Sequence, residues 1–409
     1  MYQIIGTWAF NKNFLNNRMS FISGPRQVGK TTLGKLFLAK INQEKNYYNW
    51  DSFTVKKKFI ENPHFFIENL PPLNSLKEKQ WIILDEIHKD KKWKEILKAY
   101  YDEFNNYLTF IVCGSAKLDI FRKTGESLLG RYFLFKMFPL GPNDIVYGEN
   151  FKLENAWDTV NPIYFESINN EFKNAVNQLF EISGFPEPFL KGKKSFYKRW
   201  QKSHISLITT EEIRDLTKIY DIARLQMLSA LLPQRIGSPI SIKNLSDILE
   251  VAHQTVKLWI HALENVYLIF QVMPYKEKIE RSIKKEKKIY FWDWGILEDN
   301  GKKFENFLAL QLLRSVTAWN EWGLGDFELF YVKTKDGRET DFLITKNKEP
   351  FLLVESKFKD TNIDKNLLYF HKKLNPKYSF QVVFIDDFYK QLSSNLFIVD
   401  IYKFLKIMV

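Results

Sequence analysis

The strongest chemical signal in this sequence of 409 residues is a short glycine-rich segment that ends in lysine and threonine. From Gly24 to Thr31 it follows the pattern G-x-x-x-x-G-K-[ST]. Glycines let the backbone curl so that its N–H groups surround a phosphate, the lysine reaches the terminal phosphates, and the threonine hydroxyl binds Mg²⁺. The pattern predicts bound ATP and Mg²⁺, with contacts from Gly24, Pro25, Arg26, Gln27, Val28, Gly29, Lys30, Thr31 and Thr32.

Two acidic residues follow an apolar segment, as hydrolysis of a bound nucleotide would require. Trp81 to Leu84 predicts a buried strand, and Asp85 and Glu86 come directly after it. We expect Asp85 to support the Mg²⁺ and Glu86 to polarise the attacking water. In the earlier segment "YYNWD", Asp51 either supports this site by holding residues that contact the nucleotide or metal, or caps the helix that begins near Phe53.

Two further residues are candidates for contact with the terminal phosphate. Ser115 ends a third apolar segment, "LTFIVCGSA", where its hydroxyl can sense the γ-phosphate or cap the next helix. Arg131 in "ESLLGRYFLF" is a candidate arginine finger, either for its own nucleotide or for that of a neighbouring subunit in a homo-oligomer. A local ion pair with Glu126 or Asp119 is the alternative for Arg131, and Arg122 could serve as the finger instead.

A second chemical pattern lies in "RETDFLITKNKEPFLLVESKF", residues 338–358. Glu355 and Lys357 share one face of an apolar strand, and a hairpin can bring Asp341 alongside from 355 − 341 = 14 positions earlier. Charges in a buried strand cost several kcal/mol unless they are paired or bound. We expect Asp341 and Glu355 to share a Mg²⁺, with Glu305 completing the shell and Lys357 beside the reacting phosphate. A structural pair between Glu355 and Lys357 on an edge strand is the alternative.

The elements that position these residues can be predicted from hydrophobic periodicity. "MSFIS" predicts a strand before the glycine-rich segment, and a helix follows it. Near the C-terminus we expect a helix in "KKFENFLALQLLRSVTAW", then strands in "FELFYVKT", "ETDFLIT" and "LLVESKF". A helix from about Asp364 to Leu374 and a strand in "SFQVVFID" come next. Strands that alternate with helices predict an α/β fold at both ends of the chain.

The middle of the chain is predicted to be helical and then to form a winged helix. Residues 170–232 show amphipathic helices, which suit a helical lid over the nucleotide. Ser241 can cap a helix whose inner face is Leu245, Ile248 and Leu249. A second helix in "TVKLWIHALENVYLI" and a strand in "IFQVMPY" complete the order of a winged helix-turn-helix.

A basic segment, residues 276–288, is the predicted wing. It holds seven basic residues and three glutamates, so its net charge is 7 − 3 = +4, which suits contact with phosphates. The second helix has no arginine for base recognition, so we expect backbone contacts with DNA rather than sequence recognition. Its candidate contact residues are Gln254, Thr255, Lys257 and His261. A winged helix that only packs between domains, with a solvated charge run, is the alternative.

Composition favours a nucleic-acid partner and a reducing compartment. The net charge of +12 favours a polyanion, and nucleic acid before a membrane surface. The single cysteine, Cys113, excludes a disulfide framework and suits the cytoplasm. No segment approaches the ~18 consecutive apolar residues of a membrane span, and the first residues do not resemble a signal peptide. We therefore expect a cytoplasmic protein without a membrane partner.

Several motifs in one order resemble a known family. "SGPRQVGKTTL", "YYNWD", "WIILDEIHK", "CGSA", "SLLGRY" and "FPLGPNDI", followed by "SGFPEPFL", are similar to the AAA-family ATPases of bacteria and archaea that carry a C-terminal DUF4143 region. The arrangement of Asp341, Glu355 and Lys357 after a helix with Glu305 resembles the PD-(D/E)xK nuclease superfamily, with Thr340 where its name has proline.

Together, the resemblances and the order of the predicted elements imply a P-loop AAA-type ATPase core, a helical lid, a winged-helix domain and a C-terminal restriction-endonuclease-like α/β domain. We expect their boundaries at residues 1–150, 151–236, 237–292 and 293–409. Two functions then remain open. The first is an ATPase coupled to a Mg²⁺-dependent nuclease in DNA repair, recombination or defence. The second is an ATP-switched scaffold that binds DNA or protein through a nuclease fold that does not cut.

Overall fold

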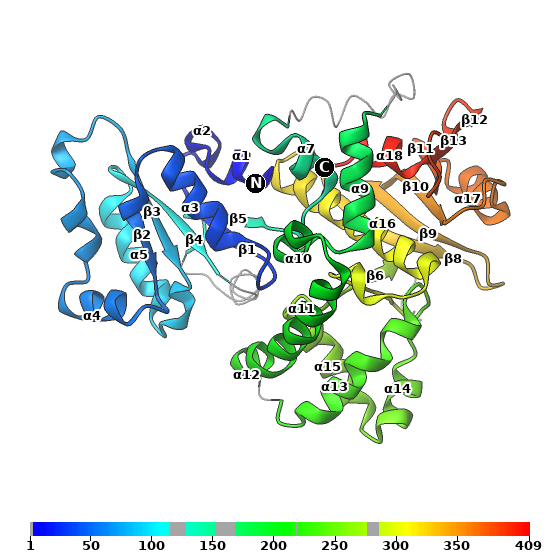
Figure 1. Cartoon of the computed structure of the whole chain (residues 1–409), viewed down its shortest axis with the longest axis horizontal. Coiled ribbons are helices and arrows are strands. Elements are labelled where there is room, and N and C mark those ends of the chain that lie inside the picture. Colours follow the sequence, from blue (N-terminus) through cyan, green and yellow to red (C-terminus); the bar gives the residue numbers. More distant parts are fainter. Residues whose placement is uncertain (1–2, 115–127, 152–167, 218, 276–285) are drawn as a thin grey trace. The chain divides into compact units, whose positions relative to one another are not determined.

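The computed structural model of this chain divides it into two compact units (Figure 1). The first unit contains residues 1–138 and 147–151, and the second contains residues 139–146 and 152–409. Within these units the structure describes residues 3–114, 128–151, 168–217, 219–275 and 286–409. The chain thus enters the second unit for eight residues, 139–146, before it returns to the first unit.

A five-stranded parallel sheet forms the centre of the first unit, in the order β2-β3-β4-β1-β5. Parallel strands with both faces covered consist of continuous apolar residues, and every residue of β1 and β4 is buried. All carboxyl ends lie at one edge of the sheet, so the loops after β1 and β3 meet there. The strands are β1 (Met19–Ser23), β2 (Tyr47–Asn49), β3 (Gln80–Asp85), β4 (Leu108–Cys113) and β5 (Tyr132–Lys136).

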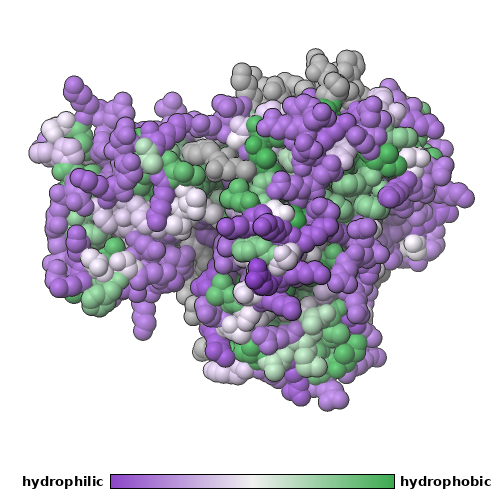
Figure 2. All heavy atoms as spheres, in the orientation of Figure 1, coloured by the Kyte–Doolittle hydropathy of each residue, from purple (hydrophilic) through white to green (hydrophobic). Residues whose placement is uncertain are grey.

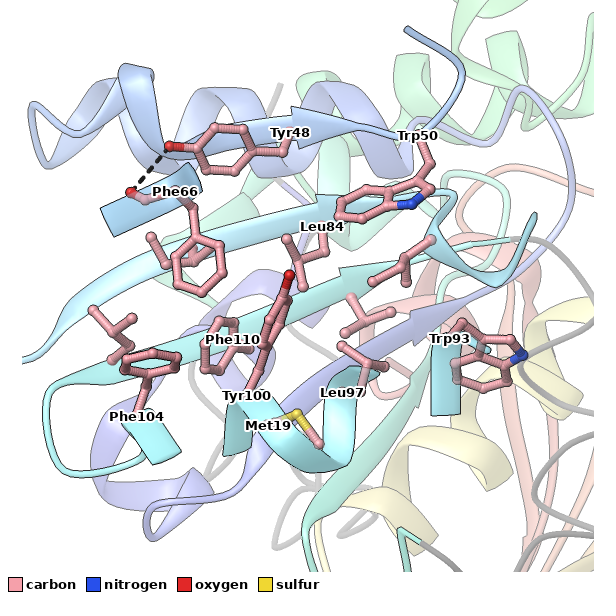
Figure 3. Close-up of a cluster of buried hydrophobic side chains, with 14 of the residues drawn as sticks. Met19, Tyr48, Trp50, Phe66, Leu84, Trp93, Leu97, Tyr100, Phe104 and Phe110 are labelled. Atoms are coloured by element: carbon pink, nitrogen blue, oxygen red, sulfur yellow. Dashed lines mark hydrogen bonds between the residues drawn. The ribbon is translucent and has the colours of Figure 1, made fainter. Parts of the chain in front are cut away.

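Aromatic side chains make up much of the core of the first unit (Figure 3). Tyr100 on α5 stacks on Phe110 of β4, and the edge of Phe66 meets Tyr100 at a centroid distance of 4.7 Å. The hydroxyl of Tyr48 donates to the carbonyl of Phe66 at 3.3 Å, which ties β2 to the segment that follows α4. The helices are α1 (Ile5–Ala9), α2 (Lys12–Leu15), α3 (Lys30–Lys40), α4 (Phe53–Glu61) and α5 (Trp93–Phe104).

The second unit contains an eight-stranded mixed sheet in the order β12-β13-β11-β10-β9-β8-β6-β7. The antiparallel strands β8, β9 and β10 follow α16, and α17 then crosses over to β11, which is parallel to β10. These are the elements, in the order, that periodicity predicts. Their bounds are α16 (Asn300–Glu321), β8 (Phe327–Lys333), β9 (Glu339–Lys346), β10 (Glu349–Lys357), α17 (Lys365–Leu374), β11 (Tyr378–Val383), β12 (Tyr389–Ser393), β13 (Leu396–Asp400) and α18 (Ile401–Lys406).

Helices occupy most of residues 170–265, as predicted. The helix α9 packs on the C-terminal half of this unit, because Phe180 contacts Phe304, Phe307 and Phe384. Its place as a lid over the nucleotide stays a prediction. The helices are α7 (Pro142–Val146), α9 (Asn170–Glu181), α10 (Pro186–Lys191), α11 (Lys194–Leu207), α12 (Ile213–Leu216), α13 (Ile222–Leu231), α14 (Ile242–Leu249) and α15 (His253–Asn265), and a π-helical turn, Ile208–Glu212, joins α11 to α12.

The hairpin expected in the winged helix extends the C-terminal sheet. Strand β6 (Ile269–Pro274) pairs antiparallel with β7 (Lys288–Phe291) and parallel with β8. Residues on both sides of the predicted boundary at 292 therefore share one sheet. The predicted wing lies mainly in residues 276–285, which are outside the described residues. A separate winged-helix domain stays a prediction.

The predicted inner face of α14 is correct for Leu245 and Leu249 and wrong for Ile248. The hydroxyl of Ser241 accepts from the N–H of Asn244 as a cap, and Leu245 and Leu249 are buried. Ile248 is 47% exposed, because it lies about 80° around the helix from the midpoint of the two leucines. Figure 2 shows hydrophobic surface over α13 and α14, and the exposed Met227 and Ile248 belong to these helices.

Candidate functional sites

The glycine-rich loop between β1 and α3 adopts the curled backbone that phosphate binding needs. Gly24 and Gly29 have φ of +148° and +104°, and Gln27 between them has φ of +60°. A Cβ atom at Gly24 would overlap the carbonyl oxygen of Met137, so the backbone position requires glycine. Pro25 and Val28 are buried, Arg26 is half-buried, and Gln27 and Thr32 are exposed.

Lys30 begins α3, and its ammonium folds over the loop. The Nζ atom donates to the carbonyls of Gly24 at 2.8 Å and Pro25 at 2.6 Å, and the residue is buried. No side chain caps the first turn of α3, so its N–H groups face the loop that would hold the phosphates. The predicted residues of the loop therefore lie together, with donors on its inner side.

Asp85, at the end of β3, accepts two hydroxyl hydrogen bonds on one oxygen. Thr31 and Tyr47 both donate to its Oδ2 atom at 2.6 Å, and Asp85 is 1% exposed. Burial and the contact with Asp85 raise the pKa of Tyr47 above its usual value, so the phenol keeps its proton. The sequence analysis does not identify Tyr47 as a partner of Asp85. The feature that places it there is the position of Tyr47 on β2, the strand next to β3.

Glu86 is held at the same edge of the sheet in a left-handed backbone conformation, with φ of +60°. Its Oε2 atom lies 3.4 Å from Lys89 Nζ and 3.5 Å from His88 Nε2. Burial raises the pKa of Glu86, although Lys89 opposes the shift. Lys89 also donates to both carboxylate oxygens of Asp51, at 2.6 and 2.7 Å. Asp51 thus contacts this site through Lys89.

The alternative role of Asp51 as a helix cap is wrong. Ser52 occupies the N-cap position of α4, and its hydroxyl accepts from the N–H of Val55 at 3.5 Å. Ser52 accepts from the N–H of Val55 at the start of α4. Asp51 instead pairs with Lys89, which also contacts Glu86.

Arg131 lies at the start of β5, at the sheet edge opposite to the glycine-rich loop. Met19 and Tyr132 are partners in the parallel pair of β1 and β5, whereas the loop follows the other end of β1. Arg131 is therefore too far to reach its own loop, and only the finger role in a neighbouring subunit stays a prediction. Its described ion pair is with Asp102, at 2.8 Å.

The other residues predicted around the terminal phosphate cannot be compared with the structure. Ser115 and Arg122, and the alternative Arg131 partners Asp119 and Glu126, lie outside the described residues. Their roles stay predictions.

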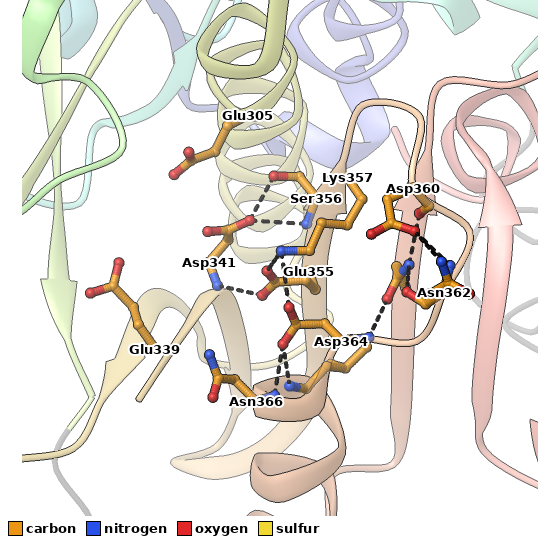
Figure 4. Close-up of polar contacts among 12 residues, drawn as sticks. Glu305, Glu339, Asp341, Glu355, Ser356, Lys357, Asp360, Asn362, Asp364 and Asn366 are labelled. Atoms are coloured by element: carbon orange, nitrogen blue, oxygen red, sulfur yellow. Dashed lines mark hydrogen bonds and ion pairs between the residues drawn. The ribbon is translucent and has the colours of Figure 1, made fainter. Parts of the chain in front are cut away.

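In the second unit, a tight hairpin brings the predicted acidic residues together. Asn347 and Lys348 connect β9 to β10 with φ of +51° and +71°, as a two-residue turn requires. The N–H of Asp341 donates to Glu355 at 3.3 Å, and Asp341 Oδ2 accepts from the N–H and hydroxyl of Ser356 at 2.9 and 2.6 Å (Figure 4). The predicted pairing of Asp341 with Glu355 is present.

Lys357 forms a network with two carboxylates on a central strand. Its Nζ atom lies 2.8 Å from Glu355 and 3.0 Å from Asp364, which caps α17 (Figure 4). The ion pair of Glu355 and Lys357 that the alternative predicts is present, but its predicted place on an exposed edge strand is wrong, because β10 has a neighbour on each side and Glu355 is 5% exposed. Burial, and next the charge of Asp341, raise the pKa of Glu355 well above its usual value. Sequence reasoning missed Asp364 as a partner.

Lys288, on β7, sits among three carboxylates. Its Nζ atom lies 2.8 Å from Glu339, 3.3 Å from Glu305 and 3.5 Å from Asp341. The residue is only 1% exposed, so its predicted contact with DNA phosphates as part of the wing is wrong. Burial, then the charge of Asp341, raise the pKa of Glu305 to about 7, and Tyr290 donates to Glu305 at 2.7 Å.

The residues around Lys288 do not fit the predicted metal. In the part of the chain that the structure describes, no three His, Cys, Asp or Glu side chains are grouped so as to hold a metal ion. The predicted Mg²⁺ shell of Glu305, Asp341 and Glu355 is therefore not assembled. An ammonium group lies beside two of these carboxylates instead.

The described residues contain no helix that is long and apolar enough to cross a membrane.

Comparison with protein families identifies three regions in the chain. Residues 16–145 match an AAA domain, which contains the glycine-rich loop, Asp85 and Glu86. Residues 173–300 match a domain of unknown function (DUF8612), and residues 300–404 match another (DUF4143). The first unit is thus an AAA domain of the ATPase type, a family that implies a bound nucleotide, and DUF4143 covers the sheet from α16 onward.

Three uncharacterized proteins are similar to large parts of the chain. One from Methanocaldococcus jannaschii is 24% identical over 66% of this chain and 59% of its own length. One from Mycobacterium tuberculosis is 22% identical over 81% of this chain and 68% of its length. One from Haemophilus influenzae is 23% identical over 90% of this chain and 89% of its length.

Two solved structures are distantly similar to this chain. The Aeropyrum pernix ORC1 protein, solved in complex with DNA, has a TM-score of 0.32 at 12% identity and covers 67% of this chain and 83% of its own. A DNA polymerase III gamma subunit-related protein of Thermotoga maritima has a TM-score of 0.26 at 12% identity, with coverages of 65% and 84%.

Proposed function

We propose that this protein hydrolyses ATP in its AAA domain and uses the cycle to control a DNA-directed second unit. The observation that supports hydrolysis best is the 2.6 Å contact between the Thr31 hydroxyl and the buried Asp85. A hydroxyl and a carboxylate on one side of a phosphate loop would hold Mg²⁺, which neutralises charge on the nucleotide phosphates when it is bound.

The residues of the AAA domain have separable roles in this proposal. Lys30 exchanges the carbonyls of Gly24 and Pro25 for the terminal phosphates, because an ammonium prefers an anion to a neutral acceptor. Glu86 orients the attacking water, and its raised pKa brings it closer to neutral pH, where a general base is most effective. Lys89, held by Asp51, fixes the orientation of Glu86.

Two substitutions test this proposal. Lys30→Ala removes the charge that contacts the phosphates, so both ATP binding and turnover should fall. Glu86→Gln keeps the phosphate loop but removes the acceptor for the water, so ATP should remain bound and turnover should fall by at least about 100-fold. Turnover is measured as phosphate release and binding by a fluorescent nucleotide. A Glu86→Gln variant that turned over at the wild-type rate would refute the role of Glu86.

Contact with DNA rests on charge and on the helices α13 to α15. The net charge of +12 attracts a polyanion, and Gln254 and His261 are exposed on α15. Backbone contacts would give binding with little sequence preference. The hydrophobic surface over α13 and α14 favours a protein partner for part of this region.

For the second unit, two hypotheses compete. The nuclease hypothesis is supported by Asp341, Glu355 and Lys357, which lie on adjacent strands with their polar atoms in contact. The scaffold hypothesis is favoured by Lys288, which fills the space among the acidic residues. We therefore propose that the second unit binds its target without cutting it.

A cleavage assay distinguishes the two hypotheses. We expect linear, branched and single-stranded DNA to stay intact with Mg²⁺ or Mn²⁺, with and without ATP. The control is the Glu355→Ala variant, purified in the same way, which reports any contaminating nuclease. Cleavage by the wild type that Glu355→Ala abolishes would establish the nuclease hypothesis instead.

A further inference from the structure

We infer that Lys288 is a built-in cation of the second unit: its ammonium occupies the position among Glu305, Glu339 and Asp341 that a divalent metal would need, so this acidic site works without metal. The inference goes beyond the proposed function, because it concerns the composition of the site whether or not DNA is its target.

Three elements converge on this ammonium. Glu339 and Asp341 point to the same face of β9 because they are two residues apart, and Glu305 comes from α16. Figure 4 shows these three carboxylates facing one another. Lys288 enters from β7, with its Nζ atom 2.8 to 3.5 Å from one oxygen of each. It also lies 5.5 Å from the ring of Tyr331, a distance at which the ring face attracts a cation.

The distances leave no room for a second cation. Mg²⁺ binds carboxylate oxygens at about 2.1 Å and keeps a near-octahedral shell of ligands. An ion bound to the same oxygens would therefore lie against the Lys288 Nζ atom. Two cations in contact repel each other strongly in a buried environment, where the effective dielectric constant is low. A metal could enter only if Lys288 left, and Lys288 is 1% exposed.

The remaining carboxylates of the cluster already have cationic partners. Glu339 also contacts Lys333 at 2.7 Å, and Glu355 and Asp364 share Lys357. The cluster holds five carboxylates and three ammonium groups, so its formal charge is 3 − 5 = −2. The five carboxylates are Glu305, Glu339, Asp341, Glu355 and Asp364. The other carboxylates of the cluster therefore also lie beside lysine side chains of the protein.

The neighbouring carboxylates, and not burial, favour the charged form of Lys288. Burial alone would lower the pKa of its ammonium, but Glu305, Asp341 and Glu339 together raise it above its usual value. Lys288 is therefore the cation that balances part of the charge of these three carboxylates. Removing it should leave a formal charge of −3 in the cluster and create a site that a divalent cation can fill.

Titration of Mn²⁺ into the nucleotide-free full-length protein, followed by calorimetry, tests this inference. Wild type and Asp341→Asn should take up the same amount of Mn²⁺, because Asp341 holds no metal in the wild type. Lys288→Ala should bind one additional Mn²⁺ per chain, and the double variant Lys288→Ala/Asp341→Asn should lose it. Any Mn²⁺ at Asp85 is common to all four proteins and cancels in the comparison.

Two further variants separate the effect of the charge of Lys288 from the effect of the volume that its side chain fills. Lys288→Arg keeps the cation and should show wild-type uptake. Lys288→Met removes the charge but fills the same volume. It should therefore lower the melting temperature, and Mn²⁺ should not restore that temperature because no space for the ion is created. Lys288→Ala should also melt at a lower temperature, and Mn²⁺ should restore it.

Two results would overturn the inference. The first is wild-type uptake of Mn²⁺ that Asp341→Asn abolishes, because the metal then binds despite Lys288. The second is a folded Lys288→Ala protein without the additional Mn²⁺. If Lys288→Ala does not fold, the comparison of wild type with Asp341→Asn still decides. ATP turnover, measured in parallel, reports separately on the proposed function.

Discussion

Tyr47 donates its hydroxyl to the oxygen of Asp85 that also accepts from Thr31, at 2.6 Å in each case. A hydrogen bond to an ionised carboxylate in a buried place is worth about 1.5–3 kcal/mol. It also restrains the Asp85 carboxylate from the side of β2. When Thr31 turns to the nucleotide, Tyr47 is the group that keeps Asp85 in position. We therefore assign Tyr47 a positioning role for the metal that accompanies ATP.

The variant Tyr47→Phe tests this role. Loss of the hydroxyl should raise the Mg²⁺ concentration for half-maximal ATP turnover roughly tenfold, while turnover at saturating Mg²⁺ changes little. Tyr48→Phe is a matched control, because that hydroxyl donates to the carbonyl of Phe66 in the core and not to Asp85. An unchanged Mg²⁺ requirement in Tyr47→Phe, or an equal change in both variants, would contradict the role.

Local patterns predict a residue only when its partners are close in sequence or follow a known spacing. Lys30 and Thr31 were predictable because the loop and the helix after it are contiguous, and Asp85 because acidic residues follow a buried strand. Tyr47 and Lys288 were missed because their partners come from other strands. Nothing in "KKEKKIYF" distinguishes Lys288 from Lys287, although strand alternation directs one of the two inward.

At the scale of the elements, type and order were predictable, but lateral pairing was not. The residues of strands β8 to β10 either alternate between apolar and polar or are continuously apolar, and short turns join the strands. Their hairpins can therefore be predicted from local signals. The pairing of β6 with β8 involves residues about 57 positions apart, Met273 with Phe330, and no local pattern encodes it. The hairpin of β6 and β7 was therefore assigned to a separate domain, although it completes the sheet that holds the acidic cluster.

The same pairing explains how Lys288 reaches the acidic residues. Because β6 lies beside β8, strand β7 becomes the edge of the eight-stranded sheet and is antiparallel to β6. Its first residue, Lys288, then points toward α16 and β9, and the next residues, Ile289 and Tyr290, are buried in the core. A sheet edge that carries a buried lysine is also protected from pairing with another chain.

For the whole molecule, the net charge of +12 supplies a long-range attraction for DNA, whereas the cluster around Lys288 contains more carboxylates than ammonium groups. The attraction must therefore come from basic residues outside that cluster. Lys287 and its neighbours Lys284 and Lys285 are adjacent to it in sequence, and Lys284 and Lys285 lie outside the described residues. The burial of Lys288 removes it from this set.

Salt dependence distinguishes a local DNA surface from a general effect of charge. The logarithm of DNA affinity should fall linearly with the logarithm of salt concentration, and replacing Lys284, Lys285 and Lys287 by alanine should reduce the slope by about one unit for each lost phosphate contact. The matched control replaces the exposed Lys56, Lys57 and Lys58 of α4, which removes the same charge from the first unit.

Fluorescence anisotropy with two unrelated duplexes measures both the slope and the sequence preference. A local surface gives a smaller slope only for the first triple variant and equal affinities for the two duplexes. Equal losses in both triple variants would mean that DNA responds to total charge, and the predicted contact through the basic segment 276–288 would be wrong.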